Sequence, residues 1–224
     1  MARILITSGP TRQYLDPVRY LTNGSSGKMG SALAAAALEL GHKVTIVSGP
    51  VNVDYPPGAE VVRVLTTEEM FAACVERFPD CDGVIGAAAP CDYRPEKVAE
   101  HKLSKTGEPL LLQLVETQDI IAALGSRKQA QQWVVGFALE TDDARFKAIT
   151  KLERKHCDWI VLNGPQAMDA ADNSIEVFDR LGQTVLRANG DKLQVARAIL
   201  SAIQDEFIAL ADEASGVDEE QGLE

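Results

Sequence analysis

The sequence predicts an α/β fold built on a doubly wound, mainly parallel sheet. Short apolar runs of strand length alternate with longer segments whose apolar residues recur at helical spacing. The alternation begins with an apolar run at 3–7, a helical segment at 28–40 and a second apolar run at 43–48. Parallel strands need crossover connections of about this length. The pattern therefore indicates a Rossmann-like arrangement.

The later elements follow the same two patterns. Gly41 marks the end of the first helix, and Met70, Cys74 and Phe78 share one face of a second helix, for which Thr67 is the expected N-cap. The other expected helices are 117–127, 143–156 and about 191–211; the other expected strands are 61–65, 83–89, 133–139 and 158–163, with a hairpin at 174–187.

Residues 90–113 break this alternation. The segment is polar, contains three prolines and ends in an alternating, strand-like stretch. In a doubly wound sheet such a segment is an insertion, and we call it the flap. Because no repeat or low-complexity linker divides the chain, we expect a single domain over residues 1–211, followed by an acidic tail at 212–224.

The charge distribution excludes some classes of partner. The net charge is −11, but eight of the 33 acidic residues and none of the 22 basic residues lie between Asp205 and Glu224. The tail is therefore expected to be disordered, and without a broad basic face on the body we expect no nucleic-acid partner. No apolar run reaches the roughly 18 residues that span a bilayer. No signal peptide is recognisable either, so we expect a cytoplasmic protein with no membrane partner.

The stretch from Asn23 to Gly30, NGSSGKMG, precedes the first helix and suggests a nucleotide-binding loop. A P-loop requires GxxxxGK[ST], whereas here the spacing is GxxGK and Met29 stands where a hydroxyl would bind magnesium. A dinucleotide site requires its glycines directly after the first strand and an acidic residue after the second, and that strand instead ends in Ser48-Gly49-Pro50. Neither motif is therefore present.

A weaker prediction remains for this turn. Backbone N–H groups of a Gly/Ser-rich turn at a helix N-terminus can bind an anion without any named motif. The alternative is that Ser25 or Ser26 simply caps the helix. Asn23 precedes the turn and offers a ligand both an amide donor and a carbonyl acceptor.

Five blocks of the sequence together resemble one family. They cover residues 8–30, 87–95, 102–105, 134–141 and 151–163, with the sequences SGPTRQYLDPVRYLTNGSSGKMG, AAAPCDYRP, KLSK, VVGFALET and KLERKHCDWIVLN. The family is phosphopantothenoylcysteine synthetase, and the resemblance spans roughly residues 3–200. It implies a ligase of coenzyme A biosynthesis that activates phosphopantothenate with a nucleoside triphosphate and then forms the amide with cysteine.

Several positions depart from the family's pattern. Pro90 and Cys91 replace a Val-Ala pair, residues 117–120 are TQDI instead of NPDI, and Asn163 is kept while the acidic residue next to it is lost. Because Cys91 has no evident partner base, we interpret it as structural. The departures leave two alternative functions open, a divergent nucleotide-binding regulatory module and an NADP-dependent reductase on the same fold.

The resemblance implies two catalytic residues. Lys102 matches the family's catalytic lysine, ten residues after Asp92, and is expected to act on the α-phosphate while the acyl-nucleotide forms. Asn23 is expected to hold the acyl carbonyl while the cysteine amine attacks. Without the family match, Lys102 would be interpreted as a solvated flap lysine.

Binding residues are implied in the same way. Lys151 and Lys155, four residues apart on one helix, are expected to face the triphosphate, although such a pair is otherwise an ordinary helix surface. Asp92 is expected to contact the ribose or the metal, and its alternative is a turn residue. The base is expected against Phe137 and the backbone of Ala87, Ala88 and Ala89, and a substrate anion against Arg19 and the turn residues Ser25, Ser26 and Gly27.

The resemblance also implies cofactors and partners. We expect Mg²⁺, phosphopantothenate, cysteine and CTP, with ATP as the alternative nucleotide. Because the chain begins at the synthetase's first strand, no flavin is expected, and a flavin-dependent decarboxylase would be a separate partner. A homodimer is expected in which the flap reaches the partner's site.

Overall fold

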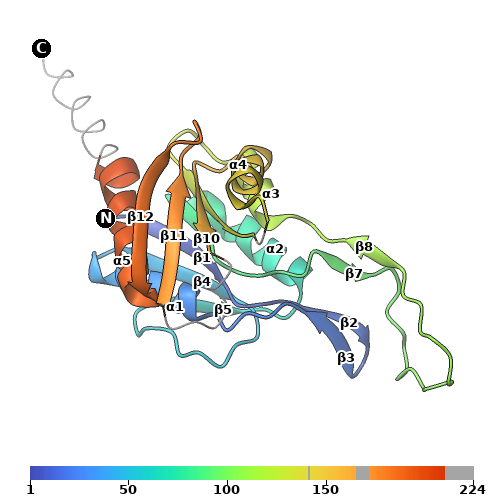
Figure 1. The fold of residues 1–224 in the computed structure, drawn as a ribbon. Helices are drawn as coiled ribbons and strands as arrows, with labels where there is room; N and C mark the ends of the chain where they lie inside the picture. Colours follow the sequence, from blue (N-terminus) through green and yellow to red (C-terminus); the bar gives the residue numbers. More distant parts are fainter. Residues whose placement is uncertain (141, 165–171, 210–224) are drawn as a thin grey trace, which may run out of the picture.

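The computed structural model describes residues 1–140, 142–164 and 172–209, and they form an α/β fold around one large sheet (Figure 1). Within these residues the sheet has eight strands, in the order β12-β11-β10-β9-β6-β1-β4-β5. Six of them run parallel: β5 (Glu60–Arg63), β4 (Lys43–Ser48), β1 (Arg3–Ser8), β6 (Gly83–Gly86), β9 (Trp133–Leu139) and β10 (Trp159–Asn163). The predicted fold class is therefore confirmed.

The strand order fixes where a ligand can bind. The chain runs outward from β1 to β4 and β5, and then returns to the other side of β1 with β6, β9 and β10. Adjacent connections at the carboxyl ends of β1 and β6 therefore leave in opposite directions, which opens a crevice at that edge of the sheet. The expected hairpin, β11 (Asp172–Phe178) and β12 (Thr184–Asp191), extends the sheet beside β10 with antiparallel pairing.

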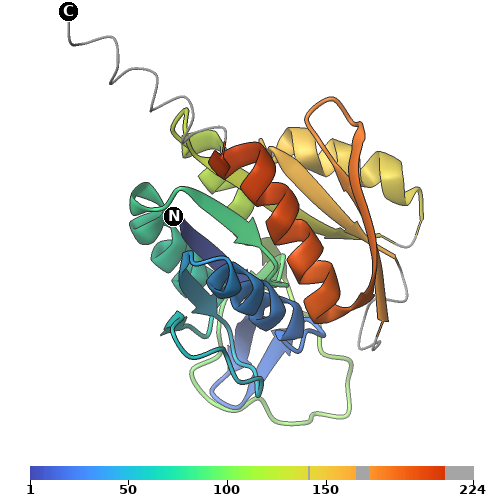
Figure 2. The same ribbon diagram turned by 90° about the vertical axis from the view of Figure 1, so that its left-hand side faces the viewer.

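The central strands β1, β4, β6, β9 and β10 are largely buried on both faces, which is why they appear in the sequence as continuous apolar runs. Ile4 and Ile6 of β1 lie in one hydrophobic cluster, and Leu5, between them, lies in the other. Helices α1 (Lys28–Glu39) and α5 (Lys192–Ile203) cover the first face, as Figure 2 shows. Helices α2 (Thr67–Arg77), α3 (Ile120–Arg127) and α4 (Ala144–Arg154) cover the second.

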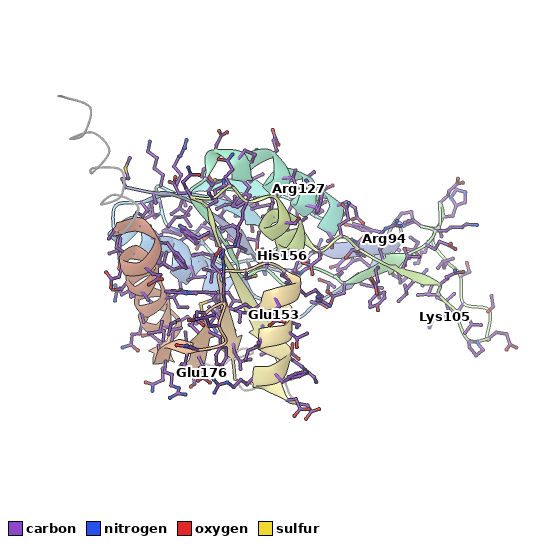
Figure 3. All side chains as sticks on the ribbon, turned by 90° about the horizontal axis from the view of Figure 1, so that it is seen from above. Arg94, Lys105, Arg127, Glu153, His156 and Glu176 are labelled. Carbon is purple, nitrogen blue, oxygen red and sulfur yellow. The ribbon has the colours of Figure 1, made fainter. Side chains whose placement is uncertain are left out.

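Two small ribbons project from the main sheet on the same side (Figure 1). One pairs β7 (Tyr93–Pro95) with β8 (Leu114–Glu116), and the chain between them forms most of the predicted flap. The other pairs β2 (Arg12–Asp16) with β3 (Arg19–Thr22) and was not predicted from the sequence. Figure 3 shows Arg94 and Lys105 on the projecting arm, well away from Glu153, His156 and Glu176.

Some predicted boundaries are wrong by one to a few residues. The N-cap of α2 is Thr66 and not Thr67: the Thr66 hydroxyl accepts from the Glu69 N–H at 3.1 Å, and the Glu69 carboxylate accepts from the Thr66 N–H. Such a cap stabilises a helix by about 1 kcal/mol. β6 ends at Gly86, so residues 87–89 lie beyond the strand in the crevice.

The remaining short elements lie at helix ends. A 3₁₀ turn, η1 (Phe78–Asp80), follows α2, and a π-helical turn, η3 (Gln204–Ala209), continues α5. The predicted acidic tail at 212–224 lies outside the described residues. No helix in the described ranges is long and apolar enough to cross a membrane.

Candidate active site

Two adjoining cavities lie at the carboxyl edge of the sheet, and they share Ala88 and Phe137 as a common wall. The first, about 240 Å³, is lined by the turn at 24–30 and by the ends of β9 and β10; we call it the turn cavity. The second, about 600 Å³, is lined by Asp92, the start of α3 and the end of α4; we call it the lysine cavity. Most of the residues predicted to bind the nucleotide and the substrate therefore line two neighbouring cavities.

The turn at the start of α1 allows its backbone to lie close to neighbouring strands and to a ligand. Gly27 is the N-cap, with φ at 74°, and no side chain caps the helix, so the alternative in which Ser25 or Ser26 is the cap is wrong. A Cβ on Gly30 would lie 2.2 Å from the Ser8 hydroxyl, so this helix start packs directly on the end of β1. The N–H groups of the first turn have no acceptor within the helix and are available to an anion in the turn cavity.

Asn23 links this turn to the chain that follows β6. Its side-chain amide donates to the carbonyl of Pro90 at 2.8 Å and, more weakly, to that of Ala89 at 3.4 Å. The residue borders the turn cavity, which begins at Gly24. Because this amide has two N–H donors, a substrate carbonyl could accept from it by replacing the weaker contact with the Ala89 carbonyl.

A cluster of threonines fixes the segment between the two cavities. The Cys91 N–H donates to the Thr11 hydroxyl at 2.8 Å, and the Cys91 carbonyl accepts from the hydroxyls of Thr117 at 2.6 Å and Thr67 at 3.2 Å. Cys91 itself is buried, and its thiol lies 3.4 Å from the Thr11 carbonyl. Burial raises the pKa of this thiol, which favours the structural interpretation of Cys91.

We predict that Cys91 reacts slowly in the native protein. With iodoacetamide at pH 8, its alkylation should be at least about tenfold slower than in the urea-unfolded chain, because burial keeps the thiol protonated and shielded. Peptide mapping by mass spectrometry measures both rates. Equal rates in the folded and unfolded protein would contradict the buried position of the thiol.

The lysine cavity contains the predicted lysine pair, and each lysine is held by a carboxylate. Lys151 forms an ion pair with Glu140, whose side chain is 12% exposed. Lys155, the C-cap of α4, lies 3.2 Å from Asp119, which also caps α3 by accepting from the Ala122 N–H at 3.1 Å. Both lysines line the same cavity, which would allow both to face a triphosphate, but neither pairing partner was identified from the sequence.

The two cavities differ in charge. The lysine cavity is lined by three cationic and three carboxylate side chains: Lys151, Arg154, Lys155, Asp92, Glu116 and Asp119. The turn cavity is lined by Lys28 and Lys192 and by no carboxylate among the described residues. Asp92 is exposed at the rim of the lysine cavity, as a metal or ribose contact requires.

Asn163 lines the turn cavity, although no role was predicted for it from the sequence. It is the last residue of β10, and its side-chain oxygen is buried in the turn cavity with no hydrogen-bond partner among the described residues. A buried acceptor without a partner costs free energy, so a ligand donor is expected to complete it. Its retention within the family-like block was the signal that could have identified it.

Three predicted site residues line neither cavity of this chain: Asn23, which directly precedes the lining residue Gly24, and Arg19 and Lys102. Arg19 forms an ion pair with Asp16 and donates to the Leu103 carbonyl at 2.5 Å. Lys102 is exposed on the flap, and neither cavity includes it. The structure therefore brings together the predicted residues of the turn, 87–89, Asp92, Phe137 and the lysine pair, but leaves Arg19 and Lys102 apart from them.

Comparisons with known proteins show the family to which the chain belongs. Two curated relatives are each called coenzyme A biosynthesis bifunctional protein CoaBC: that of Vibrio vulnificus (strain YJ016) is 41% identical over 207 residues, and that of Escherichia coli (strain K12) is 39% identical over 217. The alignments cover 90% and 94% of this chain but 51% and 52% of those proteins, so the chain spans about half the length of these relatives.

A solved structure matches over a whole domain. The crystal structure of the C-terminal domain of a CoaBC protein superposes with a TM-score of 0.79 at 37% identity, covering 94% of this chain and 96% of that one. The family model for the DNA/pantothenate metabolism flavoprotein C-terminal domain matches residues 1–207. The chain therefore belongs to the family of DNA/pantothenate metabolism flavoprotein C-terminal domains.

Proposed function

We propose that this protein is a phosphopantothenate–cysteine ligase of coenzyme A biosynthesis. The observation that carries the proposal is the pair of cavities on either side of Ala88 and Phe137. A ligase that passes through an acyl-nucleotide must hold a nucleotide and an acyl substrate side by side. The relatives' name, which refers to coenzyme A biosynthesis, supports a role in that pathway.

In the first half-reaction, a carboxylate oxygen of phosphopantothenate attacks the α-phosphorus of the nucleoside triphosphate, and the bond to pyrophosphate breaks. We assign the triphosphate to the lysine cavity, where its phosphates compete with Glu140 and Asp119 for Lys151 and Lys155. The substrate's own phosphate goes to the turn formed by Ser25, Ser26 and Gly27. Phe137 and Ala88 on the shared wall, with the backbone of Ala87 and Ala89 beside it, hold the base of the nucleotide.

In the second half-reaction, the amine nitrogen of cysteine attacks the acyl carbon and the nucleoside monophosphate leaves with one former carboxylate oxygen. The tetrahedral intermediate carries negative charge on the acyl oxygen, and amide donors stabilise such charge. Asn23, at the border of the turn cavity, is the residue to which we assign this role.

The residues at the lysine cavity fit Mg²⁺ bound together with the triphosphate. Magnesium usually keeps several waters and takes only one or two carboxylates besides the phosphates. Asp92 offers such a carboxylate at the cavity rim, and the described residues contain no group of three or more His, Cys, Asp or Glu that would form a metal site without the nucleotide. When bound, Mg²⁺ would offset phosphate charge at the reacting α-phosphate.

The flap supports a homodimer with composite sites. The flap projects from the chain (Figure 1) and exposes Leu110 and Leu111, the second of which is 92% exposed. Apolar side chains in such positions favour contact with a partner. In such a dimer, the flap of one chain would bring Lys102 to a cavity of the other chain. Within its own chain, Lys102 does not line the lysine cavity.

We therefore expect a dimer in sedimentation velocity at micromolar concentration. Leu111→Glu should shift the protein to monomer and remove activity, because it places charge in the contact. Leu181→Glu is the matched control, since Leu181 is 80% exposed on the β11–β12 turn, and it should change neither property. A fully active monomer would contradict the composite site.

The activity is tested by incubating the protein with phosphopantothenate, cysteine, Mg²⁺ and each nucleoside triphosphate in turn. The ligase is expected to release pyrophosphate, and to release nucleoside monophosphate only when cysteine is present, with CTP preferred over ATP. Binding of nucleotide without turnover would indicate a regulatory module. Oxidation of NADPH in a substrate-dependent manner would indicate a reductase.

A further inference from the structure

We propose that Asp16 and Arg19 form a clamp that positions Lys102 by holding the backbone of the next residue, Leu103. The inference rests on the proposed function, in which Lys102 acts on the nucleotide. It also replaces the role predicted for Arg19 from the sequence. Arg19 is a positioning residue for the flap, and within this chain it bonds Asp16 and Leu103 and lines neither cavity.

Asp16 is the centre of this clamp. The residue lies at the end of β2 and is fully buried. One carboxylate oxygen accepts from the N–H groups of Val18 and Arg19, both at 2.9 Å, and closes the turn of the ribbon. The other accepts from the Arg19 Nε at 2.8 Å and from the Leu103 N–H at 3.1 Å.

Arg19 completes the hold on Leu103. Its guanidinium bonds Asp16 through Nε and Nη2, and Nη2 also donates to the Leu103 carbonyl at 2.5 Å. Both backbone groups of Leu103 are therefore tied to the β2–β3 ribbon. A planar guanidinium can donate hydrogen bonds to a carboxylate and a carbonyl at the same time. A lysine ammonium lacks this fixed arrangement of N–H donors.

Of the contacts that hold the flap, the clamp is the one nearest in sequence to the proposed catalytic lysine, Lys102. The Ala99 N–H donates to the Leu15 carbonyl at 2.9 Å, so the ribbon contacts the flap both before and directly after Lys102. Leu103 is half-buried, whereas Lys102 and residues 104–112 are exposed. The position of the Lys102 backbone is therefore set by the two contacts with the ribbon.

The carboxylate of Asp16 stays ionised at neutral pH. Burial by itself raises the pKa of Asp16, but the hydrogen bonds from the Arg19 side chain and from the amides of Val18, Leu103 and Arg19 outweigh it and hold this pKa well below its usual range. A carboxyl with a depressed folded pKa contributes its stability above the unfolded pKa and loses it only as the solution becomes strongly acidic. At neutral pH the ion pair with Arg19 is complete.

The test uses Arg19→Gln and Arg19→Lys in the full chain, with Arg12→Gln as the matched control. Arg12 lies on the same ribbon, and its guanidinium packs 4.4 Å from the ring centre of Tyr20. Hydrogen–deuterium exchange over the peptide that contains Leu103 measures the clamp without requiring activity. Kinetics of acyl-nucleotide formation measure the consequence for Lys102, and thermal unfolding verifies that each variant is folded.

Arg19→Gln should speed exchange at Leu103 at least about tenfold and lower kcat of the first half-reaction about tenfold to a hundredfold, because a catalytic group displaced by about 1 Å loses that much rate. The KM for phosphopantothenate should change little, Arg19→Lys should lie in between, and Arg12→Gln should resemble the parent protein. Unchanged exchange, or a raised KM at unchanged kcat, would overturn the clamp and return Arg19 to substrate binding. If the parent protein shows no ligase activity, the exchange result still decides whether the clamp exists, so the two proposals fail separately.

Discussion

Replacing Lys102 with glutamine is expected to abolish formation of the acyl-nucleotide. The first half-reaction joins a carboxylate to a phosphate, and a cation at the α-phosphate stabilises the charge that develops there. Loss of one such contact typically lowers the rate about a hundredfold to a thousandfold. Glutamine keeps much of the length of lysine and removes the charge, so the effect reports the cation itself.

The measurement is single-turnover quenching followed by separation of the acyl-nucleotide and pyrophosphate. Lys105→Gln is the matched control, because Lys105 is an exposed lysine on the same flap and carries no predicted role. The control should retain most of the parent rate. If Lys102→Gln formed the intermediate at the parent rate, Lys102 would be an ordinary solvated residue of the flap.

The second large effect is expected for Asn23→Asp, in the opposite half of the reaction. Asn23 donates through its amide to the carbonyl of Pro90 at 2.8 Å, and an aspartate in its place has no donor and adds a negative charge. The acyl oxygen would then lose its stabilising contact while the lysine cavity stays intact. The acyl-nucleotide should therefore form and accumulate, and its conversion by cysteine should fall about a hundredfold or more.

Quenched reactions with and without cysteine measure this accumulation directly. Asn52→Asp is the control, because Asn52 is exposed in the loop after β4 and its change adds the same charge. Equal amounts of trapped intermediate in Lys102→Gln and Asn23→Asp would contradict the division of roles between these residues.

The sheet could be predicted well from the sequence because the apolar pattern that identifies each strand and helix lies within that element. Each parallel strand must be apolar on both faces, and each crossover helix must be apolar on one, so the alternation is visible without any tertiary knowledge. The β2–β3 ribbon escaped prediction because its strands are short and half-exposed, and its turn at 17–18 lacks an Asn-Gly or Asp-Gly signal. Thr66 and Thr67 were confused because adjacent hydroxyls satisfy the same capping pattern.

The site was predicted less completely because several of its contacts join residues distant in sequence. Leu103 is 87 residues from Asp16, and Lys155 is 36 residues from its partner Asp119, so neither pairing leaves a periodic signal in the sequence. The prediction that the lysine pair and Phe137 belong to the site followed from the family resemblance alone. The different charge of the two cavities became visible only once the chain was folded.

The central claim is that the carboxylate of phosphopantothenate is activated as an acyl-nucleotide at the wall shared by the two cavities. Phosphopantothenate labelled with ¹⁸O in its carboxylate tests it most directly, with mass spectrometry of all phosphorus-containing products after turnover with cysteine. The account predicts one ¹⁸O atom in the released nucleoside monophosphate and none in pyrophosphate. Label in inorganic phosphate, or none in the monophosphate, would contradict it.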